Sequence, residues 1–201
     1  MDKAAVQAAL KEINSTQDLL ERGLKLAGLI STLFAEQGTE LVVVGGAAIE
    51  FYTEGNYMSG DIDFCRKKGG PVPPRVQQEI IGSLNGSGGP RSWKIGGLFV
   101  DLLGTLEKDS RTPFTRLATK YGTISLIPVE ELLVERILIA FYPRRDKESE
   151  LCAKVLLAQC VSGKIKADWK EVDRLAADKR YAITERVRAL KKEVADGLKK
   201  Q

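Results

Sequence analysis

The sequence predicts an α/β (α+β) fold, in which a small mixed sheet flanked by helices is followed by a C-terminal helical bundle. Two observations predict it. Short β-rich runs alternate with helical periodicities in the first part of the chain, and only helical segments follow Pro128. The chain has 201 residues, of which 43% are hydrophobic, so it is long enough to bury a core. We therefore expect an α/β region over residues 1–127 and a helical region over 128–201.

Two helices open the chain. Residues 3–13 have the composition of a short helix. The pair Ser15-x-x-Asp18 has the spacing of a capping box, which satisfies the free N–H groups at the start of a helix. Apolar residues from Leu19 to Phe34 then recur at helical spacing, and Gly38 is a typical helix stop. We expect the second helix between the capping box and this glycine.

Strands alternate with short helices between residues 40 and 127. The β-rich run 40–44 ends at the pair Gly45-Gly46, and the pair Gly96-Gly97 joins two apolar runs as a hairpin. Proline is well suited to the first turn of a helix, which favours a helix that starts at Pro73. The other expected elements are a helix over 47–52, a strand over 61–65, a helix over 73–84, hairpin strands over 93–95 and 98–103, and a strand over 123–127.

The C-terminal part carries four expected helices. The first is apolar on most of its sides, which predicts that it is buried. The pair Asp168-x-x-Glu171 has capping-box spacing at the start of the third. The expected ranges are 129–141, 147–161, 168–178 and 184–198.

Composition excludes several kinds of chemistry. The sequence has no histidine, so Ser-His-Asp catalysis, Cys-His catalysis and histidine-ligated zinc are excluded. The net charge of +4 is too small to indicate a nucleic-acid binder by itself. Three widely spaced cysteines, Cys65, Cys152 and Cys160, argue against a disulfide framework. The sequence shows neither an apolar run long enough to span a bilayer nor a signal peptide, and we expect a cytoplasmic protein without membrane contact.

Three aspartates are the main functional signal. Asp61 and Asp63 are separated by one residue on an expected strand, so both carboxylates point to one side while Ile62 points to the other. Asp101 lies in the middle of an apolar run, where an acid is expensive to bury. If its strand lies beside 61–65, the three acids form one cluster. Carboxylates that lie together repel unless a cation lies between them, and Mg²⁺ is the expected cation.

The glycine pair provides a second part of the same site. Gly45 and Gly46 end a strand and lead into a helix, where free backbone N–H groups can bind phosphate oxygens. Three acids can hold two divalent ions, one beside the attacking oxygen and the other beside a triphosphate and its leaving group. A Mg²⁺ site that binds a nucleoside triphosphate (NTP) is therefore the hypothesis.

This ordered pattern resembles the DNA polymerase β-like nucleotidyltransferase superfamily. The residues that match the family pattern are Gly45, Gly46, Asp61, Asp63 and Asp101, and the similarity is greatest to small bacterial stand-alone members and AbiEii-type toxins. The resemblance implies a nucleotidyltransferase fold and catalytic and metal-binding roles for the three aspartates. It also implies transfer of a nucleoside monophosphate from an NTP to a hydroxyl acceptor.

The resemblance adds two further candidate nucleotide-binding residues. Ser59 stands shortly before the aspartates and could hydrogen-bond a phosphate, and Arg136 stands where toxin relatives often carry a lysine that binds nucleotide. The acceptor is open at this point: RNA such as tRNA, a protein or a small molecule all fit. The toxin resemblance also allows an antitoxin partner.

Two alternatives stay open beside the enzyme. In the first, the chain is a catalytically impaired module of the same fold that binds a nucleotide or a partner protein. In the second, it is a structural assembly protein, and Asp61-x-Asp63 is a solvated strand edge. The second leaves three acids on apolar strands unexplained.

Overall fold

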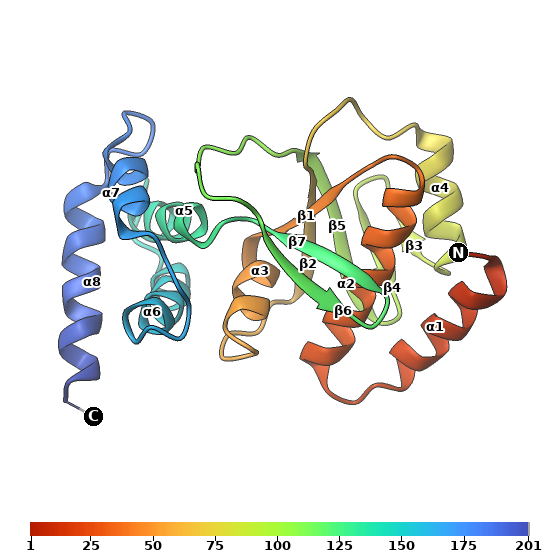
Figure 1. The fold of residues 1–201 in the computed structure, drawn as a ribbon, viewed down its shortest axis with the longest axis horizontal. Coiled ribbons are helices and arrows are strands. Elements are labelled where there is room, and N and C mark those ends of the chain that lie inside the picture. The colour runs from red at the N-terminus through yellow and green to blue at the C-terminus, as the bar shows by residue number, and fades with distance from the viewer. Residues whose placement is uncertain (201) are drawn as a thin grey trace. The chain divides into compact units, whose positions relative to one another are not determined.

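A computed structural model describes residues 1–200, which divide into two compact units. The sheet unit comprises residues 1–51, 58–107 and 115–126, and the helical unit comprises 52–57, 108–114 and the chain from 127 onward. The helical unit thus includes two short segments that precede the C-terminal helices. The domain boundary between residues 127 and 128 stays a prediction. Figure 1 shows the elements of each unit.

The sheet is mixed, as the sequence predicts. Within residues 1–200 it has seven strands in the order β3-β4-β5-β2-β1-β7-β6. Strand β2 is antiparallel to β1 and parallel to β5, while β7 is parallel to β1. The strands are β1 (Leu41–Val44), β2 (Asp61–Arg66), β3 (Ser87–Gly88), β4 (Ser92–Ile95), β5 (Leu98–Thr105), β6 (Thr115–Thr119) and β7 (Gly122–Leu126).

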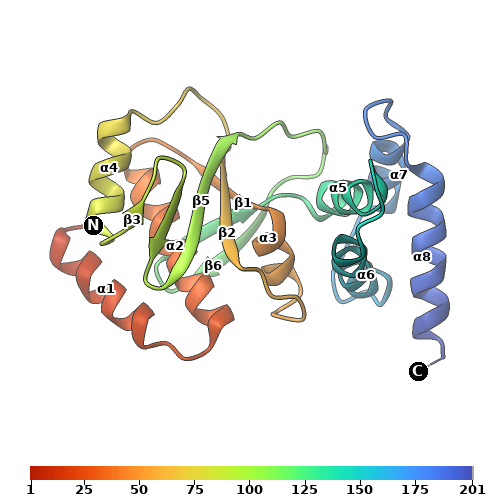
Figure 2. The same cartoon turned by 180° about the vertical axis from the view of Figure 1, so that it is seen from behind.

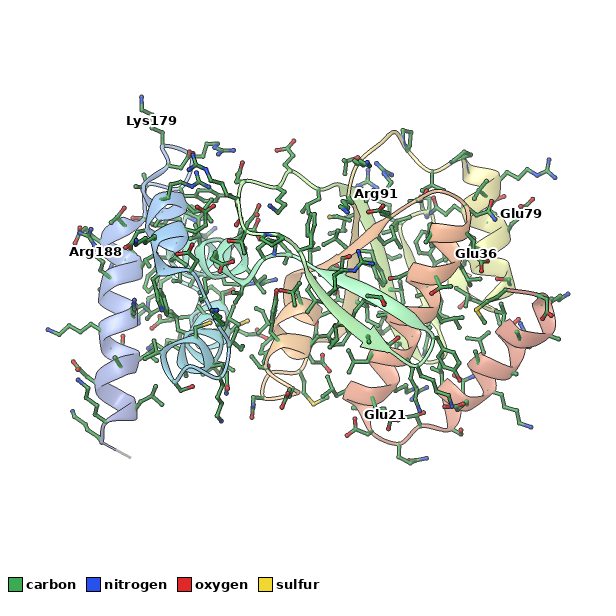
Figure 3. The ribbon with its side chains drawn as sticks, in the orientation of Figure 1. Glu21, Glu36, Glu79, Arg91, Lys179 and Arg188 are labelled. Atoms are coloured by element: carbon green, nitrogen blue, oxygen red, sulfur yellow. The ribbon has the colours of Figure 1, made fainter. Side chains whose placement is uncertain are left out.

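One face of the sheet is covered by helices. Helix α2 (Leu19–Glu36) packs on β7, β1 and β6, and α1 (Lys3–Ser15) packs on α2 and α4 (Pro74–Ser83). Figure 1 shows α2 crossing the strands, and Figure 2 shows β5 from behind with no helix over it. In Figure 3, Glu21 on α2 and Glu79 on α4 project away from the sheet.

The strands on the β4–β5 side show the alternation of a half-covered sheet. Trp93 and Ile95 of β4 are buried, whereas Ser92 and Lys94, which alternate with them, are exposed. On β5, Val100 and Leu102 are buried and Phe99 is exposed. Side chains alternate between faces along a strand, so the exposed residues mark the open face.

The start of α2 differs from the expected capping box. Ser15 is the last residue of α1, and its hydroxyl donates to the carbonyl of Glu12. Asp18 is the cap instead, and its carboxylate accepts a hydrogen bond of 2.7 Å from the N–H of Glu21. Asp18 is therefore the cap, and Glu21 supplies the N–H that it accepts. Ser15 precedes three more residues that connect the helices, which places it too early to cap α2.

Three other elements differ from the predictions. Helix α3 (Gly45–Tyr52) begins directly after β1 and not at residue 47. Strands β3 and β6 were not expected, because β3 is two residues long and β6 is a mostly exposed edge strand of polar composition. Neither has the apolar alternation that predicts a strand from sequence.

The helical unit contains the four expected helices. They are α5 (Val129–Phe141), α6 (Lys147–Val161), α7 (Trp169–Ala177) and α8 (Thr184–Leu198). Helix α5 is the centre of this unit: most of its residues are buried, and it packs on α6, α7 and α8. Figure 3 shows Arg188 projecting from α8 and Lys179 from the preceding connection.

Buried glutamates fasten the connections of the helical unit. The carboxylate of Glu131 accepts hydrogen bonds from the N–H groups of Asp109 and Ser110 at 2.9 and 3.1 Å. Glu171 accepts from the N–H of Arg111 at 2.6 Å. These carboxylates hold the segment 108–114 on α5 and α7, since buried N–H groups need an acceptor.

The helical unit also contains a carboxyl with an altered acidity. Burial raises the pKa of Glu135 on α5 to about 7, and the neighbouring charges of Glu131 and Asp109 add to the rise, while Arg136 opposes it.

In residues 1–200, no helix combines the length and the apolar character that a membrane crossing requires.

We predict that Asp18→Ala lowers the free energy of unfolding by about 1 kcal/mol, because α2 loses its cap. Ser15→Ala is the matched control, since the hydroxyl of Ser15 makes an exposed bond within the end of α1. Urea denaturation of both variants measures the difference. Equal losses in the two variants would contradict the assignment of the cap.

Glu135→Gln should change how stability depends on pH. The unfolded carboxyl ionises near pH 4.5 and the folded one near pH 7, so the wild type loses stability as the pH rises between these values. The variant does not ionise there and should gain about 3 kcal/mol over the wild type across this range. Thermal unfolding at a series of pH values checks this. Glu185→Gln on α8, whose side chain is 86% exposed, is the control and should show no such gain.

Candidate functional site

Strand register brings two of the aspartates together. Asp63 is the partner of Val44 on β1 and of Asp101 on β5, and Asp101 is in turn the partner of Ser92 on β4. The four residues therefore form one row across four neighbouring strands. Directly opposed residues in a sheet lie about 5 Å apart, close enough for their side chains to interact.

Asp61 completes the group from the start of β2. It stands two residues before Asp63, so both side chains are on the same face of the sheet. The carboxylates of Asp61, Asp63 and Asp101 each offer an oxygen within 4.8 Å of the others, and none of the three residues is buried. The structure thus places the three sequence-predicted acids in one cluster.

Core packing holds these acids in place. Ile62 and Phe64 alternate with the aspartates of β2 and are buried, at 5% and 1% exposure. Val100, beside Asp101, is 2% exposed. A shift of one residue in either strand would turn an acid toward the core, so burial of these apolar residues fixes the register.

The glycine pair lies beside the cluster. Val44 is opposite Asp63, and Gly45 follows it directly and begins α3 with a φ of 64°. This left-handed conformation favours glycine. The first N–H groups of a helix have no partner inside the helix and carry partial positive charge. Gly45 and Gly46 therefore begin a helix next to Asp63, in a position suited to an anionic ligand.

A contact that the sequence did not reveal holds Asp61. The hydroxyl of Ser59 donates to Oδ1 of Asp61 at 3.1 Å, and the N–H of Ser59 donates to Oε2 of Glu50 at 2.7 Å. Burial raises the pKa of the Glu50 carboxyl, an effect that the Ser59 N–H opposes. An acid within the otherwise apolar run of α3 was the available signal for this residue.

The donor set fits a hard divalent cation. Three carboxylates with oxygens within 4.8 Å match the oxygen ligands that Mg²⁺ takes, and Mg²⁺ completes its shell with water or substrate phosphates. Sulfur and nitrogen ligands, which favour zinc or copper, are not part of the group. Asp61, Asp63 and Asp101 are therefore the candidate ligands.

Arg136 belongs to the other unit. It lies on α5, where its charge acts on Tyr57 and Cys152 of the helical unit and lowers the pKa of both groups, against a larger rise from burial. Its role in nucleotide binding stays a prediction.

Two hollows lie in the sheet unit. A small one of about 50 Å³ is lined by Glu50, Ser59 and Asp61 together with the apolar side chains of Leu19, Met58 and Phe99. A larger one of about 490 Å³ lies between α4 and the β3–β4 hairpin and includes Trp93. Trp93 alternates with Ser92, so it is on the face opposite the acids. The small hollow is the one beside the acid cluster.

Known structures share this fold at low sequence identity. The antibiotic-resistance factor ANT(2'')-Ia in solution has a TM-score of 0.53 at 17% identity, over 81% of this chain and 94% of its own. Its crystal structure with adenylyl-2''-tobramycin gives 0.54 at 16%, over 78% and 96%. An antigenic nucleotidyltransferase-like protein from Paracoccidioides brasiliensis gives 0.52 at 14%, over 87% and 94%.

These similarities confirm the expected fold, which is that of nucleotidyltransferases. No family model matches the sequence. No curated protein matches it either.

We predict that the acid cluster binds divalent cations. Mg²⁺ should raise the unfolding temperature of the wild type, and Asp101→Asn should abolish that rise, because one of the three carboxylates is lost. In metal-free buffer the variant should be at least as stable as the wild type, since one of the three mutually repelling charges is removed. Calorimetric titration with Mn²⁺ measures binding directly. Glu40→Gln is the control, because Glu40 pairs with Lys67 and is not part of the cluster.

Proposed function

We propose that this chain, which has the nucleotidyltransferase fold, is a Mg²⁺-dependent enzyme that transfers a nucleoside monophosphate from an NTP to a hydroxyl group. One observation carries the proposal: three carboxylates with oxygens within 4.8 Å of one another lie beside the helix start at Gly45 and Gly46. The same fold in ANT(2'')-Ia, a protein seen with adenylyl-2''-tobramycin, supports it.

The position of each residue determines its proposed role. Gly45 and Gly46, with the N-terminus of α3, bind the triphosphate through backbone N–H groups. Asp61 and Asp63 would hold the Mg²⁺ ions, and Asp101 would join them as a ligand of the catalytic one. Bound Mg²⁺ supplies charge that offsets the triphosphate and helps the attacking hydroxyl lose its proton.

The reaction is an in-line displacement at the α-phosphorus. The acceptor oxygen forms a bond to this phosphorus, the bond to the bridging oxygen breaks, and pyrophosphate leaves with the electron pair. Asp101 accepts the hydroxyl proton and passes it to water. Phosphoryl-type transfer depends on position and charge more than on a covalent intermediate, so the absence of histidine from the sequence is no obstacle.

Ser59 stays a proposed phosphate contact, and the structure adds a contact to the ligand set. Its hydroxyl donates to Asp61, which orients that carboxylate. We therefore assign Ser59 to positioning of the ligand set, and Glu50 in turn holds Ser59 by accepting its N–H. Arg136 stays a proposed nucleotide contact. The toxin role, an antitoxin partner and a tRNA acceptor have the sequence resemblance as their sole support.

The double variant Asp61→Asn, Asp63→Asn should lose transfer by roughly a thousandfold or more, because charge neutralisation at the phosphate is lost. The assay incubates each α-labelled NTP with Mg²⁺ and cell lysate and asks which molecule becomes labelled. Glu40→Gln is the control and should keep full activity.

Two outcomes separate the alternatives. Undiminished transfer by the double variant would refute the roles given to Asp61 and Asp63. Mg²⁺-dependent NTP binding by the wild type without transfer to any acceptor would favour the impaired binding module.

A further inference from the structure

The row of site residues has two ends, and the in-line reaction assigns a role to each. Gly45 follows Val44 at the β1 end, where the triphosphate binds. In an in-line displacement the attacking and leaving oxygens are on opposite sides of the phosphorus. Pyrophosphate therefore leaves toward the glycine end, and the acceptor approaches from the end formed by β5 and β4.

The acceptor end is apolar. Phe99 and Leu103 stand two residues before and after Asp101 on β5, and their exposed fractions are 55% and 42%. Phe99 is also the strand partner of Asp61, so it borders the acid cluster directly. The ammonium group of Lys94 lies 5.8 Å from the centre of the Phe99 ring.

The apolar surface continues around Asp61. Leu19 and Met58 are 49% and 54% exposed, and with Phe99 they line the hollow of about 50 Å³ that includes Asp61. Exposed apolar side chains that gather at one place typically mark a binding site, because leaving such area in water costs free energy. Leu19, Met58 and Phe99, together with Leu103 beyond Asp101 on the same face of β5, are called the acceptor strip below.

Size and charge restrict what the acceptor strip can bind. A small-molecule site usually encloses about 300–1,000 Å³, whereas the hollow here is about 50 Å³. A polycation such as an amino sugar needs carboxylates around it, and RNA needs several Lys or Arg contacts to its phosphates. Glu50 and Asp61 line the hollow beside the apolar side chains, but both accept hydrogen bonds from Ser59 and Asp61 is a candidate metal ligand, so these carboxylates are already engaged. The strip residues themselves are apolar, and Lys94 lies against Phe99. These features fit an extended apolar partner.

We propose that the acceptor is the hydroxyl of a serine, threonine or tyrosine side chain in a polypeptide, with apolar residues on both sides of it. This proposal rests on the nucleotidyltransferase function above. The flanking apolar residues pack on Phe99 and Leu103, and the hydroxyl reaches Asp101. Its oxygen bonds to the α-phosphorus, pyrophosphate leaves with the bridging-bond electrons, and Asp101 takes the proton, so the product is a nucleotidylated polypeptide.

The test compares acceptors and variants in one assay. The acceptors are a short peptide with a central serine between leucine and phenylalanine residues, its threonine and tyrosine counterparts, the same peptides with lysine flanks, tobramycin, and a single-stranded RNA. Transfer is measured from a mixture of the four α-labelled NTPs with Mg²⁺, and the mass of each acceptor is determined. Peptide binding is measured separately by fluorescence anisotropy.

Phe99→Ala should weaken binding of the apolar peptides and lower kcat/KM for them by roughly tenfold to a hundredfold, because the largest apolar contact is lost. Phe99→Leu should restore much of the loss. Binding of Mn²⁺ and NTP should not change, since the aspartates and glycines remain. Leu151→Ala is the matched control: Leu151 is 63% exposed on α6 and should have no effect.

Three results would overturn the proposal. Faster transfer to tobramycin or RNA than to the apolar peptides would assign another acceptor and leave the nucleotidyltransferase function intact. Equal rates for apolar and lysine-flanked peptides, or an unchanged rate in Phe99→Ala, would remove the role of the strip alone. Failure of the wild type to bind Mn²⁺ and NTP would remove both the proposed function and this inference.

Discussion

The pairing of β2 between β1 and β5 is the constraint on which the site depends. Three like charges converge only because the hydrogen bonds of this ladder and the burial of Ile62, Phe64 and Val100 hold them there. Strand pairing and core burial thus stabilise an arrangement that repulsion between carboxylates opposes. The apolar face of β2 and the acidic face of β2 are two results of a single alternation.

Local sequence patterns predicted most helices and strands and two parts of the site. Features that depend on pairing between distant segments could not be predicted in the same way. Asp61-x-Asp63 and the glycine pair are visible in the sequence because each acts within a few residues. The parallel pairing of β2 with β5 joins segments about forty positions apart, so the place of Asp101 was a conditional expectation that the register then settled. The contact from Glu50 to Ser59 depends on how the chain returns after α3, which local spacing does not encode.

The misplaced cap and the unexpected edge strand have the same physical origin. Ser15 and Asp18 are both good capping residues, and the helix ends at Ser15 because its hydroxyl bonds back to Glu12. Strand β6 is recognised by its pairing with β7 and not by its side chains, which are mostly exposed. In both cases a hydrogen bond with a backbone group determines the secondary structure. The sequence shows the order of side chains but not which backbone groups are bonded.

The direct passage from β1 into α3 has a practical consequence for engineering. Val44 ends a central strand and Gly45 begins a helix, so an insertion there would rotate α3 and its N–H groups away from Asp63. The exposed segment at Gly69 and Gly70 is different, because even an added Cβ at either glycine would meet no atom within 4 Å. A reporter domain or an affinity tag can be grafted at that second location while the row of Val44, Asp63, Asp101 and Ser92 keeps its alignment.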